Sequence, residues 1–174
     1  MPTRNRVDWT VDPGVYELFP RWDRGDAVAC GRYRKVAYLV RGNGIGALCA
    51  YLAFEDGTTR TLLDAAGSDL PVHGGVTFDS RSIVEMMERG DYGWGWDEDD
   101  FADGVTVLGW DYMHAGDGLD PDRFDSSVSD STKELFLKGL FYDGPAWTVE
   151  EVLQDVAHCV DWLYSATLNA AETR

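Results

Sequence analysis

Two carboxylates and an imidazole stand close together in the segment GWDYMHAGD, which runs from residue 109 to residue 117. Asp111, His114 and Asp117 are spaced three residues apart within it. The apolar run at 105–108 comes directly before them, and a strand that ends in a glycine-flanked turn is a common way to present polar groups. We therefore predict that the end of a strand delivers these three side chains to a functional site.

A second polar segment, VHGGVTF at 72–78, is the expected partner of the first. Its paired glycines allow the backbone to approach a ligand closely or to adopt a positive φ, which a β-branched residue would resist. We expect the two segments to meet in space at a pocket open to solvent. The predicted ligand-binding residues are His73, Gly74, Gly75, Thr77, Asp111, His114 and Asp117.

If the two segments converge, they bring together two imidazoles and two carboxylates. The candidate metal ligands are His73, Asp111, His114 and Asp117, a nitrogen and oxygen set that suits Zn, Mn or Fe and leaves room for a water molecule. A divalent metal is therefore the expected cofactor if there is one. Water bound to such a metal becomes a nucleophile near neutral pH, which would suit hydrolysis of a phosphodiester or a glycosidic bond.

Two interpretations need no metal. In the first, His114 is oriented by Asp111 or Asp117 and acts as a general base, so that His114 and Asp111 are the catalytic residues. In the second, the cluster is structural: Asp111 caps the turn after the strand, and the two histidines are buried hydrogen-bonded partners. The sequence leaves all three interpretations open.

The elements that must position this site are predicted to be mainly strands. Apolar runs at 36–40 and 47–54 are bounded by turn residues, which favours buried strands joined by a hairpin at 42–46. The glycines of that hairpin lack the full pattern of a nucleotide-binding loop. Residues 58–63 are predicted to pair back as a third strand. The alternating charges at 21–34 indicate a solvated loop or an irregular edge.

The strongest helix signal begins at Thr148. Glu151 follows three residues later and completes a capping box, and apolar residues then recur at helical spacing along one face. His158 falls off that face and is expected at the surface. Shorter helices are predicted at 80–89 and at 131–140, the latter with Leu135, Phe136 and Leu140 facing inward.

These elements predict a single α+β domain over residues 1–174. Its expected core is a twisted, mainly antiparallel sheet from about residue 35 to 110, with the C-terminal amphipathic helix packed on one face. Residues 1–12 are expected to be loose, and 90–104 and 118–131 to form long loops. The basic residues Arg32, Arg34 and Lys35 are expected to form intramolecular ion pairs.

A formal net charge of −16 and a pI near 4.3 argue against general binding to nucleic acids or to anionic membranes, because like charges repel. The acidity serves solubility, or it mimics DNA and docks on a basic protein. The cysteines, three in number, lack a CxxC spacing, which is typical of buried thiols in a reducing cytoplasm. With no apolar run of about 18 residues, a soluble cytoplasmic protein is expected.

Four segments carry a resemblance: GALCAYLA at 46–53, VHGGVTF at 72–78, LGWDYMHAGD at 108–117 and WTVEEVL at 147–153. Together they resemble an uncharacterised family of small phage and prophage proteins with VHGGLTY and GFDxxHxGD motifs. Ala50 and the pair Tyr112–Met113 depart from the family pattern, whereas the candidate histidines and aspartates fit it. The resemblance implies a phage-type accessory protein in the bacterial cytoplasm, a class in which antagonism of host defence is frequent.

The expected function follows from the site and from this resemblance. The protein is predicted to bind, and to sequester or hydrolyse, a small polar, nucleotide-like ligand at the His/Asp pocket. The alternative is an acidic, DNA-mimicking inhibitor that docks on a basic host protein. Binding of that second kind would be strongly salt-sensitive and unaffected by His73→Ala or Asp111→Ala.

Overall fold

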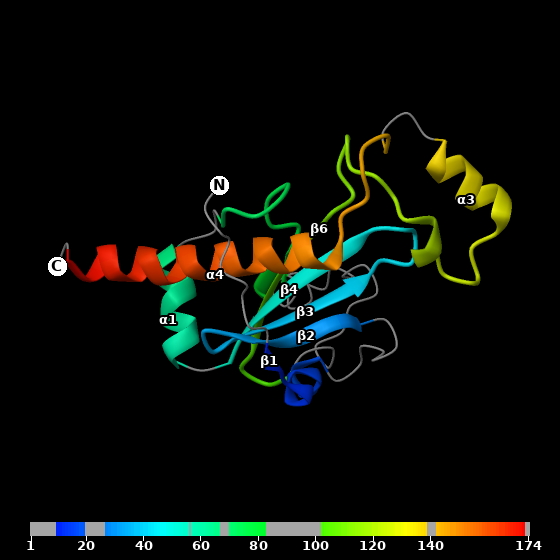
Figure 1. Ribbon diagram of the computed structural model, residues 1–174. Coiled ribbons are helices and arrows are strands. Elements are labelled where there is room, and N and C mark those ends of the chain that lie inside the picture. Colours follow the sequence, from blue (N-terminus) through cyan, green and yellow to red (C-terminus); the bar gives the residue numbers. More distant parts are fainter. Residues whose placement is uncertain are drawn as a thin grey trace.

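A computed structural model describes residues 10–19, 27–55, 57–66, 70–82, 102–138 and 142–172. Its centre is a six-stranded antiparallel sheet with the order β1-β2-β3-β4-β6-β5 (Figure 1). The strands are β1 (Thr10–Val11), β2 (Ala27–Tyr33), β3 (Val36–Gly42), β4 (Leu48–Phe54), β5 (Phe78–Asp79) and β6 (Thr106–Asp111). The predicted α+β class with a mainly antiparallel sheet is confirmed.

The helical elements are η1 (Pro13–Leu18), α1 (Gly57–Ala66), η4 (Pro121–Arg123), α3 (Asp130–Leu137) and α4 (Val149–Glu172). The long helix α4 crosses one face of the sheet, and α1 packs beside its C-terminal half (Figure 1). Helix α3 lies apart from the sheet, beyond the N-terminal end of α4. No helix within the described ranges is long and apolar enough to cross a membrane.

The central strand β3 is buried on both faces, which explains its continuous apolar run. Val36, Tyr38 and Val40 belong to the core beneath α4. Ala37 and Leu39, which alternate with them, belong to a second core on the opposite face, together with residues of η1. Because successive side chains of a strand point to opposite faces, a strand covered on both sides must be apolar throughout.

Helix α4 begins where its capping box predicts. The Glu151 backbone N–H donates to Thr148 Oγ1 over 3.2 Å, and Glu151 Oε2 accepts from the Thr148 backbone N–H over 2.9 Å. His158 is exposed, as predicted. The face toward the sheet is apolar and buried, with Val152, Val156, Cys159, Val160 and Leu163 in the core. All three cysteines are free and buried, as the sequence indicated.

The prediction of a third strand at 58–63 is wrong, because this segment lies in helix α1. Thr59, Leu62 and Leu63 are buried and stand at the i, i+3, i+4 spacing that lines one helix face. Helix α1 packs against α4 through that face. Strand β4 therefore pairs with β6, which comes much later in the chain, and not with residues 58–63.

The prediction of a solvated loop or an irregular edge at 21–34 is wrong for residues 27–33, because these form β2, which pairs along its length with β3. The sheet therefore starts earlier than residue 35, and β1 adds Thr10–Val11 from a segment expected to be loose. The expected ion pairs are confirmed for two of the three basic residues. Arg32 of β2 contacts Asp12 and Glu55, and Arg34, in the turn after β2, contacts Asp161.

The helix expected at 131–140 is α3, and its inward face is predicted correctly for Phe136 but wrongly for Leu135. Leu135 is 73% exposed, whereas Phe136 packs against Phe124. The loop expected at 118–131 contains the short helix η4. Residues 80–82 are helical, as expected at the start of 80–89. The remainder of that helix, from 83, and the part of the expected loop up to 101 lie outside the described residues, as does Leu140.

Candidate functional site

Strand pairing brings the two polar segments together. β5 runs antiparallel to β6 and places Phe78 opposite Gly109, and the Thr77 N–H donates to the carbonyl of Gly109 over 3.0 Å. Because the two strands run in opposite directions, the residues before β5 lie beside the residues that follow β6. His73 therefore meets the loop that carries His114 and Asp117.

Asp117 is the centre of the cluster, and it is only 7% exposed. Its Oδ2 lies 2.9 Å from His73 Nε2 and 3.6 Å from His114 Nδ1, and it accepts the His114 backbone N–H over 2.8 Å. Its Oδ1 accepts the Trp147 indole N–H over 2.9 Å. The two imidazoles thus share one carboxylate oxygen, and the indole uses the other.

Hydrogen bonds keep Asp117 ionised. Burial by itself would raise the pKa of this carboxyl, but the hydrogen bonds from Trp147, from the His114 backbone and from His73 outweigh burial and hold the pKa below its ordinary value. At neutral pH the cluster therefore contains a fixed negative charge between two imidazoles.

His114 Nδ1 is the one buried side-chain nitrogen or oxygen, within the described residues, that has no hydrogen-bond partner. The side chain as a whole is 33% exposed, so the ring has one edge at the surface and this nitrogen turned inward. An unpartnered buried nitrogen costs about 1–3 kcal/mol relative to a satisfied one. Such an atom marks a place where a ligand would stabilise the protein.

One atom from each of His73, His114 and Asp117 can be chosen so that all three lie within 4.8 Å of one another. Two histidines and one carboxylate form a common ligand set for Zn²⁺ and for non-haem iron. The structure therefore contains a candidate metal site. It consists of three of the four residues that the sequence predicted as metal ligands.

Asp111, the fourth predicted ligand, lies beside the cluster rather than in it. Its Oδ1 is 4.0 Å from His114 Nδ1 and accepts the Met113 backbone N–H, which is the turn-capping role considered above. Its Oδ2 accepts the Thr77 hydroxyl over 3.1 Å. Asp111 and Thr77 therefore form a hydrogen-bonded pair at the border of the site.

The two glycines of the upstream segment differ in their surroundings. Both have positive φ angles, +67° for Gly74 and +85° for Gly75. A Cβ atom on Gly74 would lie 2.1 Å from the His114 ring, whereas one on Gly75 would meet nothing within 4 Å. Gly74 is thus required for the close approach of the two loops, whereas Gly75 adopts the turn conformation with open space around it.

Residues that sequence reasoning missed complete the cluster. The His73 ring stacks on Tyr112, with centroids 5.4 Å apart, and contacts Trp147 at 4.7 Å. Asp155 of α4 accepts the His73 backbone N–H over 3.3 Å and the Tyr112 hydroxyl over 2.8 Å. From the sequence, Asp155 was assigned only to the C-terminal helix and Trp147 only to the segment before it. A polar residue near the apolar stripe of α4 was the available signal for Asp155.

Comparison with known proteins identifies no relative. No family model fits the sequence, no curated protein aligns with it, and no solved structure is significantly similar to it. The resemblance to a phage family and the hypothesis of an acidic inhibitor therefore stay predictions.

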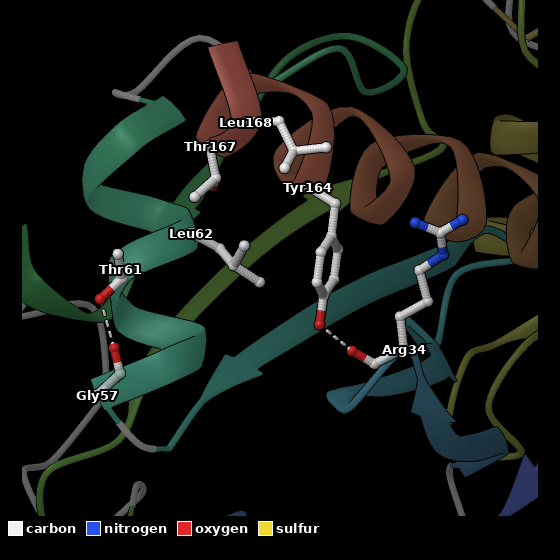
Figure 2. Close-up of a pocket in the computed structure, with 7 residues that line it drawn as sticks. All are labelled: Arg34, Gly57, Thr61, Leu62, Tyr164, Thr167 and Leu168. Atoms are coloured by element: carbon white, nitrogen blue, oxygen red, sulfur yellow. Dashed lines mark hydrogen bonds between the residues drawn. The ribbon is translucent and has the colours of Figure 1, made fainter. Parts of the chain in front are cut away.

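A separate pocket of about 490 Å³ lies between α1 and the C-terminal part of α4 (Figure 2). Leu62 and Leu168 give it a mainly apolar surface, and Tyr164 stands between the pocket and the Arg34 side chain. The hydroxyls in its wall are used within the protein. Thr61 donates to the carbonyl of Gly57, Thr167 to that of Leu163, and Tyr164 to that of Arg34.

Proposed function

We propose that the protein holds a divalent metal ion at His73, His114 and Asp117 and uses it to bind a small polar, nucleotide-like ligand. The observation that supports this best is the set of three metal-ligand atoms within 4.8 Å, next to a buried His114 Nδ1 without a partner. A metal ion satisfies such a nitrogen, because neutral imidazole nitrogen is a good ligand for Zn²⁺ and its neighbours in the periodic table.

The charge of the chain also favours a cation at this place. With a formal net charge of −16, the protein attracts divalent cations and repels free phosphate groups. A metal ion with three protein ligands keeps an open position and supplies local positive charge. A nucleotide-like anion can bind to that position even though the rest of the surface is acidic.

Sequestration and hydrolysis are two forms of this proposal. In the hydrolytic form, a metal held by His73, His114 and Asp117 would supply Lewis-acid activation of water, and a nearby carboxylate would accept the proton. Asp111 suits that role, since it is 32% exposed and is oriented by the Thr77 hydroxyl. His114 suits it less well, because its Nδ1 faces the cluster and is used as a ligand. The phage-type accessory role, with antagonism of host defence, is the biological form that the sequence resemblance supports.

The test begins with metal binding. The chain has three histidines, of which His158 is exposed on α4 and serves as the matched control. We expect calorimetric titration of metal-free protein with ZnCl₂ to show one site per chain. Binding should be lost in His73→Ala and His114→Ala and be unchanged in His158→Ala. Equal binding by all four proteins would exclude this centre.

Ligand binding is measured next, on protein with and without zinc. We expect cyclic and linear nucleotides to bind to the zinc-loaded protein and to be released by EDTA. Turnover of a nucleotide that is lost in Asp111→Asn, with zinc still bound, would support the hydrolytic form. If the protein binds zinc but none of these nucleotides, the proposed metal centre is retained and the proposed nucleotide-like ligand is excluded.

A further inference from the structure

The indole of Trp147 gives the two Asp117 oxygens different surroundings. Its N–H donates to Oδ1 over 2.9 Å, while both imidazole nitrogens face Oδ2. Each oxygen thus accepts one N–H, from the indole at Oδ1 and from the His114 backbone at Oδ2, and both imidazole nitrogens lie on the Oδ2 side. A metal ion between those nitrogens therefore meets Oδ2 first, and binding to both oxygens would crowd it against the indole N–H.

Trp147 is itself held from several sides. Its ring contacts those of His73 and Tyr112, with centroids 4.7 and 4.8 Å away. Its carbonyl accepts a hydrogen bond of 2.7 Å from Arg123, and the next residue is the N-terminal cap of α4. The indole therefore has little freedom to turn away, and the Oδ1 hydrogen bond is a fixed part of the site.

A centre of two imidazole nitrogens and one carboxylate oxygen discriminates among cations. Ca²⁺ takes about 6–8 oxygen ligands, often from carboxylates that bind with both oxygens, and Mg²⁺ requires an octahedral oxygen shell. Zn²⁺ accepts four ligands in a tetrahedron and prefers imidazole nitrogen. Limiting Asp117 to one oxygen therefore favours a small tetrahedral ion over larger oxygen-seeking ones.

We infer that Trp147 is a specificity-determining residue, which makes Asp117 a one-oxygen ligand and selects Zn²⁺ over Mn²⁺, Mg²⁺ and Ca²⁺. This inference rests on the proposed metal centre and adds the identity of the ion and the residue that decides it. Trp147 does not touch the metal, and it acts through Asp117.

The test compares Trp147→Phe with Leu163→Ala. The phenylalanine keeps an aromatic ring and removes the indole N–H, whereas Leu163→Ala damages the core of α4 at a distance from the cluster. We expect Trp147→Phe to weaken Zn²⁺ binding by about 10–100-fold. Mn²⁺ binding should weaken less, so that the Zn²⁺/Mn²⁺ affinity ratio falls. Leu163→Ala should lower stability and leave that ratio unchanged.

The visible spectrum of the cobalt-loaded protein tests the same inference through the coordination number of the ion. Co²⁺ in place of Zn²⁺ should give the intense visible bands of four-coordinate cobalt, and these should weaken in Trp147→Phe as the second Asp117 oxygen becomes available. Weak six-coordinate bands in the wild type, or an unchanged affinity ratio in Trp147→Phe, would overturn the role of Trp147 alone. If the wild-type protein binds none of these ions, the proposed metal centre itself is wrong.

Discussion

The two ends of α4 carry very different features. Near its N-terminal end, two imidazoles and an indole converge on one carboxylate, and one buried nitrogen has no partner. At its C-terminal end, α4 and α1 line a mainly apolar pocket of about 490 Å³ whose hydroxyls already donate to backbone carbonyls. The polar groups at the first end include one without a partner, whereas the hydroxyls at the second end are all used within the protein.

This difference shows why volume alone does not identify a functional site. A ligand gains specificity from polar groups that the protein leaves available, and such groups are rare in a fold because burying them without partners is costly. The pocket between α1 and α4 presents a satisfied surface. The cluster at His114 includes a polar atom without a partner, which is why the function is proposed there.

The largest expected effect is on stability, at the pocket end. Leu62 is 4% exposed and packs in the main core, so Leu62→Ala should lower the free energy of unfolding by about 2–5 kcal/mol. Zinc affinity at 25 °C should not change, because the folded variant keeps the cluster intact. Urea unfolding and zinc titration measure the two quantities. A joint loss of both would mean that the two regions are coupled.

A change at the cluster should affect zinc affinity directly. Gly74→Ala places a methyl group 2.1 Å from the His114 ring, and must push the two ligand loops apart. We expect zinc affinity to fall at least about tenfold, the lower range for disturbed metal surroundings. Gly75→Ala is the matched control, since it has a similar positive φ but open space around its Cβ. Both variants should lose stability through backbone strain, and equal zinc affinities would contradict the close approach of Gly74 to His114.

The capping box connects α4 to the cluster through Trp147. Thr148→Ala should cost about 1 kcal/mol of stability and should weaken zinc binding slightly, because it loosens the start of the helix next to the indole. Chemical denaturation and zinc titration of the same sample measure both effects. A loss of stability with no change in zinc affinity would show that Trp147 is held independently of the helix cap.

The same capping box should also depend on pH. The hydrogen bonds from Thr148 to Glu151 hold the pKa of Glu151 below its ordinary value. A lowered folded pKa contributes stability above the unfolded value, and that contribution disappears as the pH falls through the folded value. The stability difference between wild type and Glu151→Gln should therefore be present at pH 7 and vanish in acid. A difference that persists in acid would exclude ionisation as its cause.

The smallest effect is expected for Leu168, which is 67% exposed in the wall of the pocket. Leu168→Ser should change stability by no more than about 0.5 kcal/mol and should leave zinc binding unchanged. Thermal unfolding by calorimetry is a sufficient measurement. A larger loss of stability would mean that the pocket surface is used for packing that the monomer does not show.

Sequence reasoning succeeded where the signal is local. The hairpin of β3 and β4 and the start of α4 depend on residues a few positions apart, and each was predicted. It failed for α1 and β2, because their structure depends on which distant element packs against them. The apolar residues of α1 suit a helix only once α4 covers them, and β2 is a strand because β3 pairs with it.

The candidate site shows the same division. The sequence by itself determined which residue types are available, namely two histidines and two aspartates on glycine-containing loops. Only the tertiary structure decided that His73 and Asp117, 44 positions apart, are in contact and that Asp111 lies to one side. Only the tertiary structure, too, brought Trp147 to Asp117. The reason is physical: caps and periodicity are local properties, whereas the pairing of β5 with β6 and the docking of α4 gain their free energy from contacts between distant parts of the chain.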